Sequence, residues 1–549
     1  MMGVLRFVAV ALVIAGCTCG RAEPAVPPEA ELDRSPAPLP EGWLYEVAID
    51  GDAALARIRE VLPEGQARAL FPSRVVDLAD QMVGTTTAQR AAITEDSPLR
   101  CIALGGRSGP VGACALRVRA DAGLEGTPGA PRGASWVEAG ERAAAIAGDV
   151  LVIAGDRSTL EQALPWLAFT AMPEDPPRVA RLRAAEHVAG TLRADLDRFV
   201  AEHAREARET VAAERSAHAE APALGEPEAV ISWLEAALAE RLALLPDLGG
   251  ITVELDVDAS GLVIDARAEV RPETPLARRI EGAGTSPVRG LRELPEGTVL
   301  AWASVEDEAS REGASGAISE RLAAIGGERL DARARTTVDT ALAAWADVRG
   351  DATVAAIGLD AEGAWAAIAT RSPHVPPIVP FRDALAIDWA DAALATPLGC
   401  ERIDPRDTDF DDAITLCDGA HLARGAHDGA SSLVIAQGTL DQARERARSL
   451  AERIATERAA IGASPDVERV MGARDPEGTF FVGYLVPSAI PTLIGRLAPS
   501  LRDRVATSAR GAAFVVRAVR EDGAVRLEAR ASRDAIADLL ALVDPRTQE

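Results

Sequence analysis

The sequence predicts an α+β protein with two similar halves, each a largely antiparallel sheet with helices packed on one face. Short alternating segments, typical of paired strands, recur between amphipathic helical segments, and several of them occur twice in the same order. The chain has 549 residues, of which 48% are hydrophobic, enough for more than one buried core. We therefore expect two repeat domains, residues 39–270 and 294–549, with a linker at 271–293.

The first element is a short export signal. Arg6 precedes an apolar run that ends in Ile-Ala-Gly-Cys at residues 14–17. The run is too short to cross about 30 Å of hydrocarbon as a helix, so it is typical of a signal peptide. Its end resembles the lipobox of bacterial lipoproteins. The resemblance implies that residues 1–16 are removed and that Cys17 carries the lipid; an ordinary secretory signal with an incidental Cys17 is the alternative.

A spacer follows the signal. Residues 17–38 are rich in Pro, Ala and Glu without periodicity, which predicts a disordered tether between the lipid and the folded part. Thr18, rather than Asp, follows Cys17, and this resembles the pattern that permits transfer to the outer membrane. We expect a lipid-anchored protein of the cell envelope, held in the outer membrane through Cys17. Cys19 has no assigned role.

Charge excludes several function classes. The formal net charge is −26, so the surface repels nucleic acid, and we expect no nucleic-acid partner. Every basic residue is Arg. A Lys Schiff base and the phosphate-binding Lys of a P-loop are therefore both excluded. No cofactor is expected.

The remaining cysteines predict two local disulfides. Cys101 and Cys114 lie in alternating apolar segments on either side of a Gly-rich turn, as in a hairpin with the two thiols facing each other. Cys400 and Cys417 lie on either side of a polar loop of similar length. We expect Cys101 to pair with Cys114, and Cys400 with Cys417. Metal ligation is the less favoured alternative, because no CxxC motif accompanies them.

A first repeated motif opens each half. Leu-Pro-Glu-Gly occurs at residues 39–42 and again at 294–297, and an apolar strand pattern follows each copy. Helical patterns then follow at 53–61 and 316–325. The shared order indicates that each half begins with a strand and then a helix.

Two further repeats occur downstream. Residues 151–163 match 433–443, each a buried strand, a turn and a helix opened by a capping box. Residues 251–266 and 513–529 each predict a hairpin that closes its half. This order resembles a class of uncharacterised, duplicated bacterial envelope proteins. The shared motifs are apolar and structural, so the resemblance implies a fold and carries no activity.

Candidate chemistry is sparse, and we identify no catalytic residue. The turn at residues 155–158, Gly-Asp-Arg-Ser, could hold an anion with its N–H groups, although helix capping explains it equally. His421 and His427 are expected in a loop, where a ligand pair is the alternative to simple polarity. None of these patterns matches a known catalytic motif.

One acidic loop is a weak calcium candidate. Asp407, Asp409 and Asp411 have the alternating spacing with which calcium loops present oxygen atoms to one side. The sixth loop position is Asp412 rather than Gly, and the twelfth is Asp418 rather than Glu. A solvated acidic turn is therefore the preferred interpretation, and we expect no resident metal.

These observations favour a non-enzymatic envelope lipoprotein that binds an unidentified envelope protein or supports the envelope. One alternative is an envelope hydrolase without a recognisable motif. Another is a small-molecule binding protein with its site between the two halves, since clefts between domains are common ligand sites. A pocket lined by ionisable residues would favour the enzyme, and an exposed apolar patch would favour the protein partner.

Overall fold

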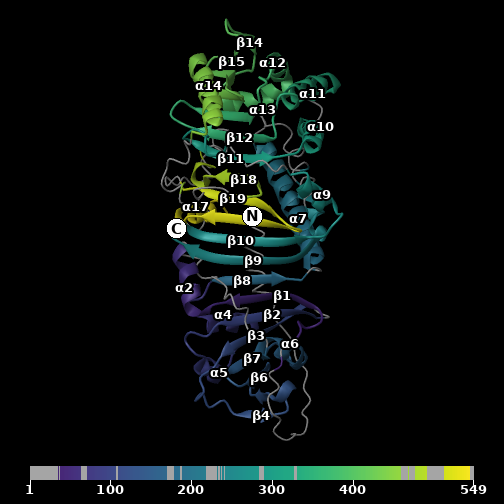
Figure 1. Ribbon diagram of the computed structural model, residues 1–549, viewed down its shortest axis with the longest axis vertical. Coiled ribbons are helices and arrows are strands. Elements are labelled where there is room, and N and C mark those ends of the chain that lie inside the picture. Colours follow the sequence, from purple (N-terminus) through teal and green to yellow (C-terminus); the bar gives the residue numbers. More distant parts are fainter. Residues whose placement is uncertain are drawn as a thin grey trace. The chain divides into compact units, whose positions relative to one another are not determined.

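The computed structural model describes most of residues 35–543. It leaves out 36, 63–70, 107–108, 170–178, 186–187, 218–231, 233–234, 236–237, 240–241, 284–289, 327–329, 459–467, 469–475, 491 and 493–511 within that range. The expected signal peptide, the lipid-bearing Cys17 and nearly all of the tether lie outside the described residues. The fold is a mixture of helices and open, largely antiparallel sheet, which confirms the α+β class (Figure 1).

Chain contacts divide the protein into two compact units. The first comprises Met1–Leu192 and Leu248–Glu269, and the second comprises Arg193–Asp247 and Val270–Glu549. Residues 193–247, which we had placed in the first domain, thus group with the second unit. The expected linker at 271–293 contains a helix, α9 (Pro275–Glu281), which Thr274 caps by accepting a hydrogen bond from the backbone N–H of Ala277.

The first unit is built on one sheet, whose pairings from β9 to β4 are antiparallel. Its strands, in spatial order, are β10 (Gly261–Val270), β9 (Leu248–Asp258), β8 (Ala180–Ala184), β1 (Trp43–Ile49), β2 (Leu99–Gly106), β3 (Gly109–Arg117), β7 (Val150–Ala154), β6 (Ala143–Ala147), β5 (Ser135–Val137) and β4 (Gly126–Pro128). Its helices are α2 (Gly51–Val61), α4 (Val75–Val83), α5 (Thr87–Ala92) and α6 (Arg157–Phe169).

The second unit is also built on an antiparallel sheet. Its strands, in spatial order, are β20 (Ala524–Ala531), β19 (Phe514–Glu521), β18 (Thr479–Leu485), β11 (Thr298–Val305), β12 (Ala352–Leu359), β13 (Ala364–Arg371), β17 (Ala430–Gln437), β16 (Ala420–His427), β15 (Ala413–Cys417) and β14 (Arg406–Asp407). Besides α9, its helices are α10 (Glu308–Gly326), α11 (Ala332–Ala346), α12 (Val379–Leu385), α13 (Asp388–Leu398), α14 (Leu440–Thr456) and α17 (Arg533–Val543).

Helices cover both faces of the second sheet, which corrects our expectation of helices on one face. Successive residues of a strand point to opposite faces. On β17, Val434 belongs to the apolar core beneath α14, whereas Leu433 and Ile435 belong to a separate core beneath α11, α12 and α13. A sequence pattern of continuous apolar residues is what a strand buried on both faces requires.

The long helix α7 (Val188–Ala217) is strongly charged, and most of its described side chains from Ala201 to Glu209 are exposed. Within the described residues, no helix combines the length and the apolar character needed to cross a bilayer.

Candidate functional site: a disulfide-closed acidic loop

Both predicted disulfides are present. Cys101 and Cys114 are direct partners across β2 and β3, with Cα atoms 4.0 Å apart. Cys400, just after α13, joins Cys417 at the end of β15, with Cα atoms 5.9 Å apart. The second disulfide closes the segment that contains the acidic residues 404–412, so this loop is fixed at both ends.

Hydrogen bonds hold the interior of this loop. The Thr408 hydroxyl lies 2.8 Å from the carbonyl oxygen of Ala413 and accepts a hydrogen bond of 3.1 Å from the backbone N–H of Phe410. The carboxylate of Asp391 accepts from the backbone N–H of Ile403 at 2.5 Å, which ties the loop to α13. Hydrogen bonds within the loop and to α13 therefore stabilise its conformation.

Two arginines pair with the loop from outside it. Arg444, on α14, donates to both carboxylate oxygens of Asp412 at 2.8 and 3.2 Å, and its guanidinium carbon lies 3.6 Å from the centroid of the Phe410 ring. Arg382, on α12, donates from a single nitrogen, Nη1, to both oxygens of Asp407 at 2.9 and 3.0 Å. The Arg444–Asp412 pair uses two nitrogens, and such a bidentate pair fixes orientation as well as distance.

The three calcium candidates do not converge. Asp407 is held by Arg382, whereas Asp409 and Asp411 are exposed to solvent. Across the part of the chain that the structure describes, no three acidic, His or Cys side chains are grouped so as to hold a metal ion. The loop is an exposed acidic turn, and Phe410 gives it an apolar tip.

Phe410 is among the exposed large hydrophobic residues of the protein, with 42% of its surface accessible. Val379, the first residue of α12, is also exposed, at 49%, and Val375, which precedes the helix, is 39% exposed. Arg424 on β16 connects the two segments: its backbone N–H donates to the carbonyl of Asp412 and its guanidinium donates to that of Pro376. We call Phe410, with Asp409 and Asp411, the Phe410 surface; Figure 1 shows β14 and β15 at one end of the second unit.

His421 and His427 are in strand β16, not in a loop, which corrects our expectation. Six residues apart on an extended strand, their Cα atoms are separated by about 20 Å, too far to share a metal ion. His421 is buried, and its Nδ1 lies 3.2 Å from the hydroxyl of Thr415, its direct partner on β15. Burial lowers the pKa of His421, so the neutral imidazole is favoured and its role is structural.

In the Gly-Asp-Arg-Ser turn at residues 155–158, the carboxylate of Asp156 accepts hydrogen bonds from within the turn itself. Asp156 accepts hydrogen bonds from the backbone N–H of Thr159 at 2.9 Å and from the hydroxyls of Ser158 and Thr159, both at 2.7 Å. Burial by itself would raise the pKa of Asp156, but these hydrogen bonds outweigh it and the pKa is lowered. Helix capping therefore accounts for this turn, and the N–H groups that an anion would need are already bonded.

One buried carboxylate in the first unit, that of Glu46, has polar partners at both of its oxygens. Glu46 on β1 accepts from the side chains of Arg100 and Trp166 on one oxygen, and its other oxygen lies 3.4 Å from Arg183. The guanidinium of Arg100 also lies 4.7 Å from the centroid of the Trp166 ring. Because each polar group has a partner, this cluster is suited to holding the core together rather than to moving a proton.

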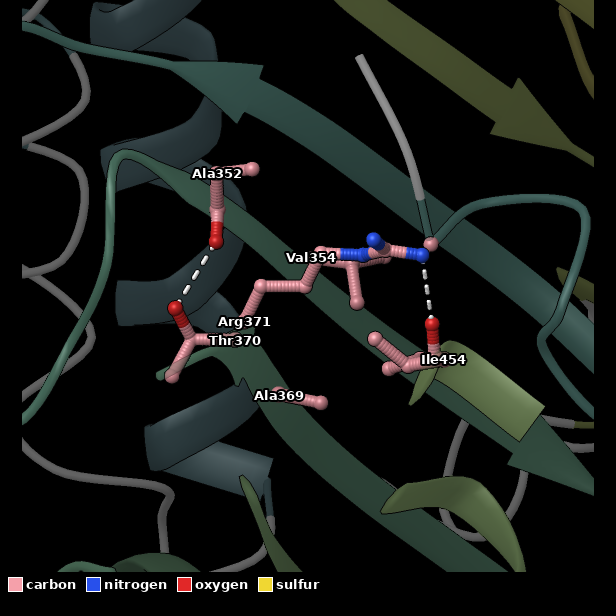
Figure 2. A pocket seen from close by; sticks show the side chains of 7 residues that line it. Ala352, Val354, Ala369, Thr370, Arg371 and Ile454 are labelled. Carbon is pink, nitrogen blue, oxygen red and sulfur yellow. Dashed lines mark hydrogen bonds between the residues drawn. The ribbon is translucent and has the colours of Figure 1, made fainter. Parts of the chain in front are cut away.

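A cavity in the second unit is too small for a ligand. It measures about 10 Å³, room for roughly one water molecule. In Figure 2 the hydroxyl of Thr370 is bonded to the carbonyl of Ala352, and Arg371 to that of Ile454, both at 2.8 Å. Its remaining lining residues are Gly290, Val354 and Ala369. Pockets that bind small molecules measure about 300 Å³ or more.

Sequence reasoning identified the acidic residues of this site but missed Phe410. Arg382 and Arg444, which fix the loop, are distant from it in sequence and carry no local signal. An isolated Phe between two Asp residues was the available clue, because an apolar side chain is unusual in so polar a turn.

Comparison with known proteins gives no assignment. No family model matches the chain, and no curated protein matches it. The solved structures that it resembles include three described as crystal forms I, IV and III of TP0453, at 11%, 12% and 11% sequence identity with TM-scores of 0.19, 0.19 and 0.20. The matches cover 45%, 46% and 44% of this chain and 82%, 85% and 83% of those chains. At such TM-scores the likeness supports no functional argument.

Proposed function

We propose that this chain is a non-enzymatic lipoprotein of the bacterial envelope, anchored through Cys17, which binds another envelope protein through the Phe410 surface. The observation that carries the proposal is an aromatic side chain 42% exposed at the tip of a loop that a disulfide and ion pairs with Arg382 and Arg444 hold in place. A loop held in this way loses little conformational entropy when it binds.

The anchor has a direct test. Cys17→Ser should abolish metabolic palmitate labelling and release the protein from the membrane fraction, because the acyl chains supply the membrane affinity. Cys19→Ser is the matched control and should leave labelling and fractionation unchanged. Wild-type protein without label, or labelling lost only in the Cys19 variant, would refute the lipoprotein assignment.

The partner has a separate test. A photo-crosslinking amino acid placed at position 410 in living cells should give a discrete protein adduct. The same amino acid at position 318, where the Ile318 side chain of α10 is 38% exposed, should give none. The same adduct pattern from both positions, or none from position 410, would count against the Phe410 surface as a binding site.

We also propose that the two halves are copies of one ancestral domain. Support comes first from strand order: adding ten to each strand number of the first sheet gives the order of the second. A register shift lies between Trp43 and Tyr45 on β1, directly after the first Leu-Pro-Glu-Gly. The same shift lies between Thr298 and Leu300 on β11, directly after the second. A bulge conserved at one place in a strand is typical of related domains.

Hairpin registers agree with this proposal. β6 and β7 close with the pair Ala147–Val150, and β16 and β17 close with His427–Ala430, each across a two-residue turn. Several connections differ, and one of them is near the Phe410 surface: α12 and α13 lie between β13 and β14, whereas β3 leads to β4 without a helix. The Phe410 surface lies beside this difference, so it is a property of the second copy alone.

A further inference from the structure

The Phe410 surface carries a charge pattern that specifies its partner. Asp409 and Asp411 directly flank Phe410, and both are exposed. Among the described residues, neither has an ion pair, in contrast to Asp407 and Asp412, which Arg382 and Arg444 neutralise. Two uncompensated carboxylates thus neighbour an exposed aromatic residue in the chain.

The ring itself shows how a cation can be bound. One guanidinium, that of Arg444, already lies 3.6 Å from the centroid of Phe410, while 42% of the residue stays exposed. The negative face of an aromatic ring attracts cations, and Arg is the most frequent partner. A second cationic side chain can contact the exposed part of the ring and pair with Asp409 or Asp411.

Resting on the proposed function, we propose that the Phe410 surface binds a cationic, partly apolar segment of a partner protein. In this arrangement an Arg or Lys of the partner pairs with Asp409 and Asp411 against Phe410. The net charge of −26 favours such a partner, because long-range attraction raises the association rate of a basic segment.

The test uses the exported chain with Cys17→Ser, purified with its disulfides formed, and two fluorescein-labelled peptides. One peptide alternates Arg and Leu, and the other alternates Glu and Leu. Fluorescence anisotropy should show binding of the Arg-Leu peptide only, weakening as salt is raised. Phe410→Ala should weaken it about tenfold, as expected for loss of a cation–π contact and of apolar area. Asp409→Asn with Asp411→Asn should weaken it and reduce its salt dependence.

Matched controls separate a specific surface from general acidity. Glu308→Gln with Glu320→Gln removes the same charge from exposed positions of α10, and Ile318→Ala removes an exposed apolar side chain there. These variants should bind like the parent. Equal losses in control and test variants, or no binding of the Arg-Leu peptide, would overturn the proposal. If peptide binding fails while crosslinking from position 410 succeeds, only the cationic partner is wrong and the protein-binding function stands.

Discussion

At the scale of single residues, the buried ion pair between Glu46 and Arg100 shows how charge is accommodated inside this protein. Glu46 and Arg100 are both nearly inaccessible, with 6% and 7% of their side chains exposed, yet they lie within an otherwise apolar core. Trp166 donates to the same carboxylate at 3.2 Å, so strand and helix are joined through one group. A buried pair of this kind adds little net stability, but loss of one partner leaves the other charge buried without compensation.

Glu46→Ala should therefore destabilise the first unit strongly, by about 3–5 kcal/mol, because Arg100 stays buried without its carboxylate. Hydrogen exchange of the β1 and β2 amides measures this locally, which suits a two-unit protein better than a single unfolding midpoint. Glu46→Leu combined with Arg100→Met replaces the pair by apolar side chains and should be far less harmful. A double variant as unstable as Glu46→Ala would show that packing, not charge, governs this position.

At the scale of elements, features that depend on nearby residues in the sequence were predicted, whereas contacts between distant elements were not. The Thr439 hydroxyl caps α14 by accepting a hydrogen bond from the Gln442 backbone N–H at 3.3 Å, and the Gln442 side-chain oxygen accepts one from the Thr439 backbone N–H. This is the capping box that the sequence predicted. The same prediction was wrong for the first of the proposed copies, because α6 begins at Arg157 and Asp156, rather than a hydroxyl residue, caps it. Both disulfides followed from local spacing. The pairs Arg444–Asp412 and Arg382–Asp407 could not be predicted, because they depend on how distant elements pack.

The β12–β13 hairpin shows how one element depends on a missing side chain. Gly358 is the direct cross-strand partner of Trp365, and a Cβ at Gly358 would lie 2.1 Å from the indole ring. Trp365 is only 2% exposed, and Arg446 lies 5.4 Å from its ring centroid while pairing with Asp360 at 2.6 Å. The ring occupies the space that a Cβ would need, so the glycine is required for steric reasons.

Gly358→Ala should destabilise this hairpin by about 1–3 kcal/mol, the range for forcing an extra group into a packed core. The measurement is hydrogen exchange of the β12 and β13 amides. Gly316→Ala is the matched control: no atom lies within 4 Å of its added Cβ, and the residue is in the interior of α10. It should stabilise α10 by about 0.5–1 kcal/mol, the helix preference of Ala over Gly. Unchanged exchange in Gly358→Ala would mean that Trp365 has room to shift.

For the whole molecule, strand registers refine the alignment of the proposed copies. The sequence match placed Leu151 against Leu433, with a two-residue deletion at the following turn. If the hairpin pairs Ala147–Val150 and His427–Ala430 are equivalent, Val150 corresponds to Ala430 and Leu151 to Ser431. The helices then align without any deletion, Ala163 with Ala443. The sequence match and the structural register differ by two residues along the strand. Because successive side chains alternate between faces, a shift of two residues keeps every apolar side chain on the same face of the sheet. Sequence similarity alone could not fix this register.

The proposed duplication predicts where an introduced pair of cysteines can form a disulfide. Under the proposed equivalence, Cys101 and Cys114 correspond to Ala355 and Ile368, which are direct partners across β12 and β13. In antiparallel sheets, closely spaced and widely spaced pairs alternate, and the Cα separation of 4.0 Å places Cys101–Cys114 in the close class. Ala355→Cys with Ile368→Cys should therefore form a disulfide during export, detectable as the loss of two hydrogens from the single tryptic peptide that contains both. Ala356→Cys with Ala367→Cys, the next pair along, lies in the wide class and should stay reduced. Cross-linking of the second pair but not the first would mean that the two hairpins are out of phase, and the proposed duplication would lose its register support.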